Sequence, residues 1–85
     1  MTKFTLKPNK YTEIAGWYGM LAILGAYALV SFKLVKSDSL VFQLLNLTGA
    51  IGLIIVAASK GVTQSVILNI FWGAVALIAL FSILL

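Results

Sequence analysis

The pattern of hydrophobic and polar positions divides the 85-residue chain into a short polar leader and three long apolar stretches. The leader covers residues 1–13, and the apolar stretches cover residues 14–32, 40–59 and 62–85. A helix needs about 20 mostly apolar residues to cross the hydrocarbon core of a bilayer. The stretches lack the alternation of polar and apolar residues that marks the strands of a membrane barrel. The sequence therefore predicts an all-α integral membrane protein, a bundle of three transmembrane helices.

Capping residues and a glycine mark the expected ends of these helices. Thr12 is expected to cap the first helix and Ser39 the second, because a hydroxyl oxygen can accept a bond from a free N–H of the first turn. Gly61 suits the left-handed residue that often follows a helix, so the second helix should end just before it. Either Thr63 or Ser65 is expected to begin the third helix. Both connections are short, so consecutive helices should run antiparallel.

The charged residues lie at the edges of the apolar stretches, and the formal net charge is +4. We interpret this excess as a topology signal and as attraction to anionic lipid, rather than as a nucleic-acid-binding surface. The leader and the second connection share one side of the membrane, and the positive-inside rule favours that side as the cytoplasm. The N-terminus is therefore expected inside the cell and the C-terminus outside. That side holds Lys3, Lys7, Lys10 and Lys60, and the opposite side holds Lys33 and Lys36.

The residue types available leave little room for catalysis or metal binding. The chain has no cysteine and no histidine, which excludes disulfides, thiolate chemistry and histidine-ligated metals. Its two carboxylates, Glu13 and Asp38, lie outside the middle of any apolar stretch. An ion-coupled pump normally carries an ionisable residue at membrane depth. We therefore expect no enzyme activity, no cofactor, no metal and no ion coupling.

Five residues within the apolar stretches are candidates for binding a solute. Gln43 and Asn46 are three positions apart, which places them on one face of the second helix. Asn69 and Trp72 lie on one stripe of the third helix, and Tyr27 lies deep in the first. Amides inside a membrane bundle commonly bond helix to helix, each bond contributing roughly 0.5–2 kcal/mol. The alternative is a polar pocket of Asn46, Asn69 and Trp72, in which amides bind hydroxyl groups and the indole stacks on a flat solute face.

Small residues form seams on which helices can approach closely. Three helices are too few to enclose a solute path, so we expect a symmetric homo-oligomer, most simply a homodimer. The seams are Ala15, Gly19, Ala22 and Ala26 on the first helix and Gly49 and Gly52 on the second.

The segment SDSLVFQLLNLTGA, residues 37–50, resembles the SDSLxxQLLNLxGA core of small, largely uncharacterised bacterial three-helix membrane proteins. The later QSVI of residues 64–67 and Trp72 also fit that pattern. More distantly, the chain resembles the MtN3-like superfamily, which includes the SemiSWEET sugar transporters. Those are three-helix protomers that pair as parallel dimers around a substrate path. The resemblance implies a SemiSWEET-like bundle in which Asn69 and Trp72 line a pocket.

One feature departs from the SemiSWEET pattern. SemiSWEET proteins carry a Pro-Gln motif in the first helix, which helps that helix to bend. The first apolar stretch here contains Gly16, Gly19 and Gly25 but no proline. The first helix therefore lacks the motif that helps the SemiSWEET helix to bend, which counts against a rocking mechanism and against transport.

Three functional hypotheses remain open on the sequence. The first is a facilitative transporter-like protomer for a small polar solute, acting as a homo-oligomer in the bacterial inner membrane. The second is a structural or accessory membrane protein without transport activity, whose amides hold helices together. A holin-like pore former is a weaker third hypothesis, because holins often end in a charged tail and this chain ends in Ile83, Leu84 and Leu85.

Overall fold

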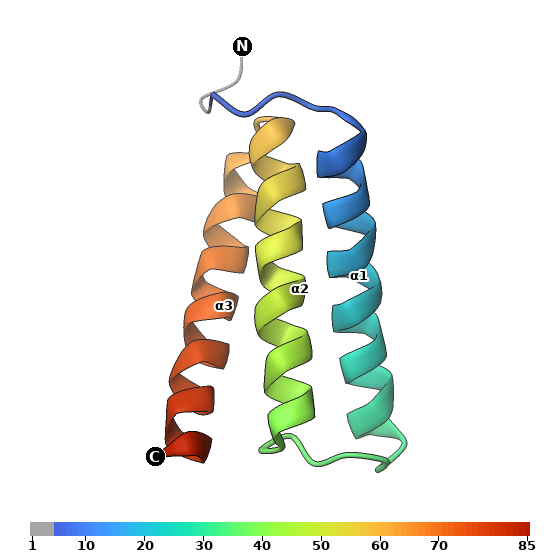
Figure 1. The fold of residues 1–85 in the computed structure, drawn as a ribbon, viewed down its shortest axis with the longest axis vertical. Helices are drawn as coiled ribbons and strands as arrows, with labels where there is room; N and C mark the ends of the chain where they lie inside the picture. Colours follow the sequence, from blue (N-terminus) through green and yellow to red (C-terminus); the bar gives the residue numbers. More distant parts are fainter. Residues whose placement is uncertain (1–4) are drawn as a thin grey trace.

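The computed structural model describes residues 5–85, which form three α-helices joined by short connections (Figure 1). Helix α1 spans Lys10–Ser31, α2 spans Leu40–Ser59 and α3 spans Thr63–Leu84. Each of the three helices is long and apolar enough to cross a membrane. The prediction of an all-α fold with three helices of membrane-spanning length is therefore confirmed.

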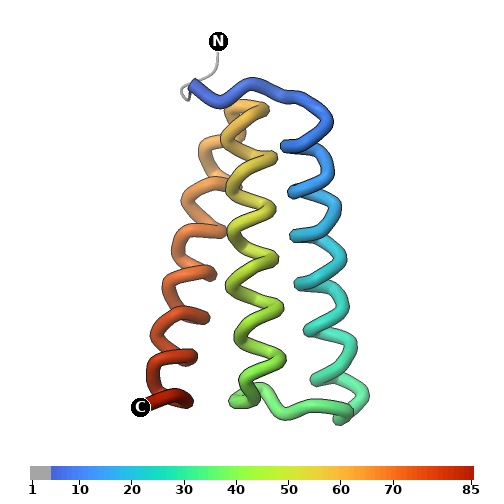
Figure 2. Tube along the Cα trace, in the orientation of Figure 1, coloured from blue at the N-terminus to red at the C-terminus, as the bar shows by residue number. Residues whose placement is uncertain are grey.

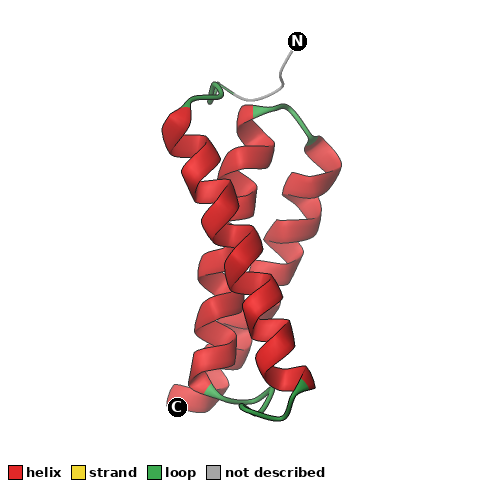
Figure 3. Cartoon of the chain, turned by 90° about the vertical axis from the view of Figure 1, so that its right-hand side faces the viewer, coloured by secondary structure: helices red, strands yellow, loops and turns green. Residues whose placement is uncertain are grey.

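Helix α2 lies between the other two helices. The helices alternate in direction. Helices α1 and α3 begin at the end drawn at the top of Figure 2, and α2 begins at the opposite end. We call these the upper end and the lower end of the bundle. Both α1 and α3 pack against α2, and within residues 5–85 they do not pack against each other. Seen from the α1 side, the helix axes are inclined to one another (Figure 3). Helices α1 and α3 are therefore held in place through α2.

The α1–α2 contact depends on glycines that let the two backbones meet. A Cβ atom on Gly19 would lie 2.8 Å from the backbone nitrogen of Leu53. One on Gly49 would lie 2.7 Å from Cγ1 of Ile23, and one on Gly52 would overlap the carbonyl oxygen of Ala15. Such close approach is the usual role of small residues in membrane bundles. The predicted small-residue seams therefore join α1 to α2 within the chain, so they do not form an interface between copies.

The α2–α3 contact is also made by small residues, but it is less tight. A Cβ atom on Gly73 would lie 3.5 Å from the Cβ of Ala50, which is an ordinary contact distance. Ala50 is fully buried, and Ala76 nearly so. This contact sets the register in which the polar side chains of α2 and α3 face each other.

Helix α1 begins four residues earlier than the pattern of apolar residues predicts. Asn9, not Thr12, is its N-cap, and the Asn9 side-chain oxygen accepts bonds from the backbone nitrogens of Tyr11 and Thr12. The Thr12 hydroxyl oxygen accepts a bond from the Asn9 backbone nitrogen at 2.9 Å, which completes a capping box. The prediction for Thr12 was wrong because its partner Asn9 holds one more turn in the helix. The Thr12 side chain is buried as a result.

The other helix ends follow local signals. The Ser39 hydroxyl oxygen accepts a bond from the backbone nitrogen of Phe42, so the predicted cap of α2 is confirmed. Gly61 has φ 71°, which confirms the left-handed residue expected after α2. Lys33 adopts φ 61° at the corresponding place after α1. At both ends the left-handed residue and its successor bond back to the last turn, the pattern of a Schellman motif. Helix α3 begins at Thr63, one of the two predicted starts.

Candidate functional site

A hydrogen bond between α2 and α3 organises the polar residues of the bundle. The indole Nε1 of Trp72 donates to the side-chain oxygen of Asn46, and the two atoms are 3.1 Å apart. Asn46 is 4% exposed and also donates from Nδ2 to the carbonyl oxygen of Phe42, one turn earlier, at 2.9 Å. The indole is therefore held by a buried amide that is itself fixed to its own helix.

The lower of two cavities beside Trp72 lies between α2 and α3 and has a volume of about 200 Å³. Gln43, in the first turn of α2, also lines it, and Nε2 of Gln43 donates to the carbonyl oxygen of Ser37 at 2.9 Å. The cavity wall combines two amides with aromatic rings and aliphatic side chains. It consists of Phe42, Gln43, Asn46, Phe71, Trp72, Val75 and Ala76.

The upper cavity is a groove between α1 and α3, with a volume of about 410 Å³. Leu53 of α2 and Ile23 of α1 line one side, and the α3 residues Ser65, Leu68, Asn69 and Trp72 line the other. No Cα atom of α1 lies within 8 Å of a Cα atom of α3. We call it the α1/α3 groove.

Asn69 lines the α1/α3 groove, and its side-chain amide is bonded within α3 through nitrogen only. Its Nδ2 donates to the carbonyl oxygen of Ser65 at 2.9 Å and to the Ser65 hydroxyl oxygen at 3.3 Å. Its Oδ1 accepts no hydrogen bond from residues 5–85. In residues 5–85 every fully buried side-chain oxygen has a hydrogen-bond partner. Because the Asn69 oxygen has none, it is not fully buried. The residue as a whole is 7% exposed, so this accessible surface is small.

Together these residues form a line of polar side chains along the bundle, here called the polar line. Ser65 is the third residue of α3, near the upper end, and Gln43 is the fourth residue of α2, near the lower end. Asn69, Trp72 and Asn46 lie between them. Trp72 is the one member that lines both cavities, and it is 47% exposed.

The structure brings together four of the five predicted site residues and leaves Tyr27 apart. Gln43, Asn46 and Trp72 share the lower cavity, and Asn69 shares the groove with Trp72. Asn46 and Asn69 line different cavities, so the two amides do not share the single pocket that was predicted. Tyr27 is 71% exposed and lines neither cavity, because it projects from the outer face of α1.

Two aromatic residues of the lower cavity were not among the predicted site residues. Phe42 precedes Asn46 by one turn on the same face of α2, and Phe71 neighbours Trp72. The helical spacing of Phe42 and Asn46 was an available signal. The position of Phe71 depends on the rotation of α3, which the uniformly apolar sequence of that helix does not reveal.

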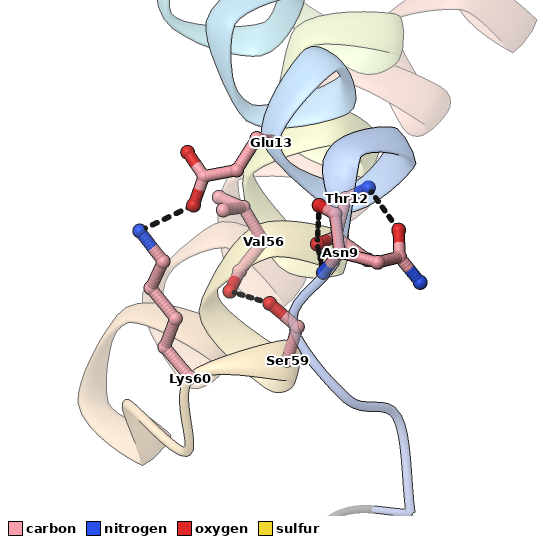
Figure 4. A network of polar contacts seen from close by, with 6 residues as sticks. All are labelled: Asn9, Thr12, Glu13, Val56, Ser59 and Lys60. Carbon is pink, nitrogen blue, oxygen red and sulfur yellow. Dashed lines mark hydrogen bonds and ion pairs between the residues drawn. The ribbon is translucent and has the colours of Figure 1, made fainter.

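Charged groups are confined to the ends of the described helices. The Lys60 ammonium and a carboxylate oxygen of Glu13 are 2.6 Å apart and join the upper ends of α1 and α2 (Figure 4). Neither side chain is buried. Neither cavity beside Trp72 is lined by a charged side chain. Within residues 5–85 no cluster of three potential metal ligands occurs.

Comparison with known proteins places the chain in a family without assigning a function. A model of an uncharacterised protein family matches residues 12–85, and the chain belongs to that family. The match covers all three helices except the first two residues of α1. No curated protein and no solved structure matches the chain. The likeness to the SemiSWEET transporters is not confirmed by these comparisons.

Proposed function

We propose that this small membrane protein is a protomer of a homo-oligomeric facilitative transporter for a small, neutral, hydroxylated solute. One observation carries the proposal: the polar line runs from the first turn of α3 at one end of the bundle to the first turn of α2 at the other. A polar side chain inside a membrane is costly unless it is bonded or lines a wet cavity. Two cavities lie along this line.

The chemistry of the cavities supports the choice of solute. Amide and hydroxyl groups offer both donors and acceptors, and the indole offers a flat apolar face. Neither cavity carries a charged side chain that would bind an ion. The α1/α3 groove, at about 410 Å³, lies within the usual size of small-molecule sites, about 300–1,000 Å³. A polyol or simple sugar fits this combination better than an ion or a nucleotide.

The open side of the α1/α3 groove supports the oligomer. A solute in the groove of a single chain would face lipid, because α1 and α3 do not meet within the described residues. A second copy placed across the groove by a two-fold axis would present the same face in return and close the path. The homodimer is the simplest assembly that does so.

Trp72 is the proposed gate of the path. Trp72 lines both the groove and the lower cavity, and its Nε1 donates to Asn46. Release of that bond would free the indole to turn and join the two cavities. This gate needs only a side-chain movement, which suits a first helix that lacks a proline kink.

Orientation and location belong to the same proposal. Lys7, Lys10 and Lys60 lie at the upper end, and Lys33 and Lys36 at the lower end; Lys3 lies outside the described residues. The positive-inside rule then favours a cytoplasmic upper end in the bacterial inner membrane. The absence of a nucleophile–base pair from the sequence supports a non-enzymatic role.

A second candidate function, an accessory protein without transport, is favoured by the bonding of the amides. Asn46 and Asn69 each donate to a carbonyl oxygen one turn earlier in their own helix. Trp72 donates to Asn46, so most of the polar groups already have partners within the chain. In this reading the polar line only holds α2 to α3.

Solute flux into liposomes containing the purified full chain separates the two candidates. The transporter proposal expects uptake of one or more sugars or polyols from a panel, and loss of that uptake in Asn69→Leu, which removes the amide that lines the groove. Ile70→Leu is the matched control, because Ile70 is exposed and lines neither cavity. Absence of uptake for every solute, with the oligomer intact, would support the accessory role.

A further inference from the structure

A third cavity, separate from the polar line, lies near the upper end between α1 and α2 and has a volume of about 280 Å³. The cavity is charged near the start of α1, at Glu13, and apolar further along that helix, at Met20. Its lining consists of Glu13, Gly16, Trp17, Met20, Leu53 and Val56. We call it the Glu13 cleft.

The Glu13 cleft has the dimensions and depth of a site for the upper part of a lipid. Glu13 is the fourth residue of α1, at the membrane-surface end of that helix. Met20 follows it by seven residues, which corresponds to about 10 Å along a helix axis. The cleft therefore places a carboxylate at headgroup level and apolar walls at the level of the first acyl carbons.

The ion pair of Glu13 and Lys60 can still form hydrogen bonds to a ligand of the cleft. Glu13 and Lys60 are 44% and 49% exposed, respectively, and are joined through one carboxylate oxygen. The second carboxylate oxygen of Glu13 accepts no bond from the described residues. An ammonium group has three N–H donors, so Lys60 can bond to a further acceptor beside Glu13.

We propose that the Glu13 cleft binds phospholipids whose headgroup carries a primary ammonium, of the phosphatidylethanolamine class. The free Glu13 oxygen accepts from the lipid ammonium, and Lys60 donates to the lipid phosphate. The side-by-side carboxylate and ammonium of the protein thus match the phosphate and ammonium of one zwitterionic headgroup. The acyl chain lies against Met20, Leu53 and Val56. This site does not depend on the proposed transport function.

Trp17 adds a second contact for the same ligand. It lines the cleft, it is 60% exposed, and it lies one turn after Glu13. Tryptophan favours the interfacial region of a bilayer, where the upper part of a lipid lies. Phosphatidylglycerol lacks the ammonium, and phosphatidylcholine has a quaternary ammonium without an N–H donor, so both should bind less well.

Native mass spectrometry of the delipidated full-length protein, with equimolar phosphatidylethanolamine, phosphatidylcholine and phosphatidylglycerol in detergent micelles, tests the proposal. We expect preferential retention of phosphatidylethanolamine. Glu13→Gln should reduce that preference about tenfold, because it removes the charge that strengthens the hydrogen bond to the lipid ammonium. Lys60→Gln should weaken binding of all three lipids. The matched control is Asp38→Asn, which removes the carboxylate of the opposite connection and should change nothing.

Two results would overturn the proposal. One is equal retention of the three lipids by the wild type. The other is a phosphatidylethanolamine preference that survives in Glu13→Gln. If Glu13→Gln lowers thermal stability but leaves lipid selectivity unchanged, the Glu13–Lys60 pair is a helix–helix contact alone. Circular dichroism of each variant in the same micelles confirms that a loss of lipid binding is not a loss of fold.

Discussion

The side chain of Trp72 on α3 is fixed by Asn46 on α2, whose oxygen accepts the indole N–H at 3.1 Å. The residue that lines both cavities is thus also the residue whose side chain is bonded across α2 and α3. The gate proposed for Trp72 and the bond that ties α2 to α3 therefore involve the same side chain. The effects of substitutions on stability and on solute movement have to be measured separately.

The Trp72–Asn46 bond should have a measurable coupling energy. Asn46→Leu leaves the indole N–H without its acceptor, and Trp72→Phe removes the donor while keeping an aromatic ring. We expect the double variant to be less destabilised than the sum of the single variants, by about 0.5–2 kcal/mol, the range for polar pairs in membrane bundles. Reversible unfolding in mixed micelles measures all three variants. Strict additivity would show that the bond contributes nothing.

The glycine contact between α1 and α2 predicts a contrast between two similar substitutions. Gly19→Ala places a methyl group against backbone atoms of α2, which cannot move aside, and should destabilise by about 1–3 kcal/mol. Gly25→Ala is the control, because nothing lies within 4 Å of the position of its Cβ atom. It should be neutral or slightly stabilising, since alanine favours a helix. Equal effects of the two changes would contradict the close backbone approach described here.

The left-handed residues after α1 and α2 predict opposite effects of two substitutions. Lys33 has φ 61°, a conformation that costs a side-chain-bearing residue about 1 kcal/mol relative to glycine. Lys33→Gly should therefore stabilise the chain by up to about 1 kcal/mol, and Gly61→Ala should destabilise it by about that amount. Lys33→Gln keeps the backbone strain and removes the charge, so it serves as the control. A stabilising effect of Lys33→Gln equal to that of Lys33→Gly would point to charge rather than to backbone conformation.

The distribution of lysines predicts the orientation in the membrane. A reporter that is active only in the cytoplasm should be active when fused to the N-terminus and inactive when fused after Leu85. Replacing Lys7 and Lys10 with glutamine should produce a mixed orientation, because the basic excess of the upper end is then lost. A cytoplasmic C-terminus in the wild type would reverse the proposed topology.

The number and length of the helices could be predicted from the sequence because their apolar stretches match the bilayer thickness. The Ser39 cap and the left-handed Gly61 at the two ends of α2 could also be predicted, because each depends only on residues close to it in the sequence. The start of α1 could not be predicted as well, because Asn9 and Thr12 both offer capping oxygens. Which of them caps depends on the reciprocal bond between the two residues.

The site could be predicted only as a set of residues, without its geometry. In helices that are apolar on all faces, periodicity does not distinguish the lipid side from the packed side. For that reason the outward position of Tyr27 was not predictable. The bond from Trp72 to Asn46 depends on the register of α2 and α3, which the contact between Ala50 and Gly73 sets.

The most direct test of the proposed path is cysteine accessibility, because the natural sequence contains no cysteine. Asn69→Cys and Ile70→Cys lie at nearly the same depth in α3, one in the α1/α3 groove and one on the exposed face. A thiol reacts through its thiolate, which requires water. If the polar line is a wet path, a membrane-impermeant thiol reagent modifies Asn69→Cys in native membranes and leaves Ile70→Cys unmodified. If neither cysteine reacts, the groove is dry and the transport proposal is contradicted.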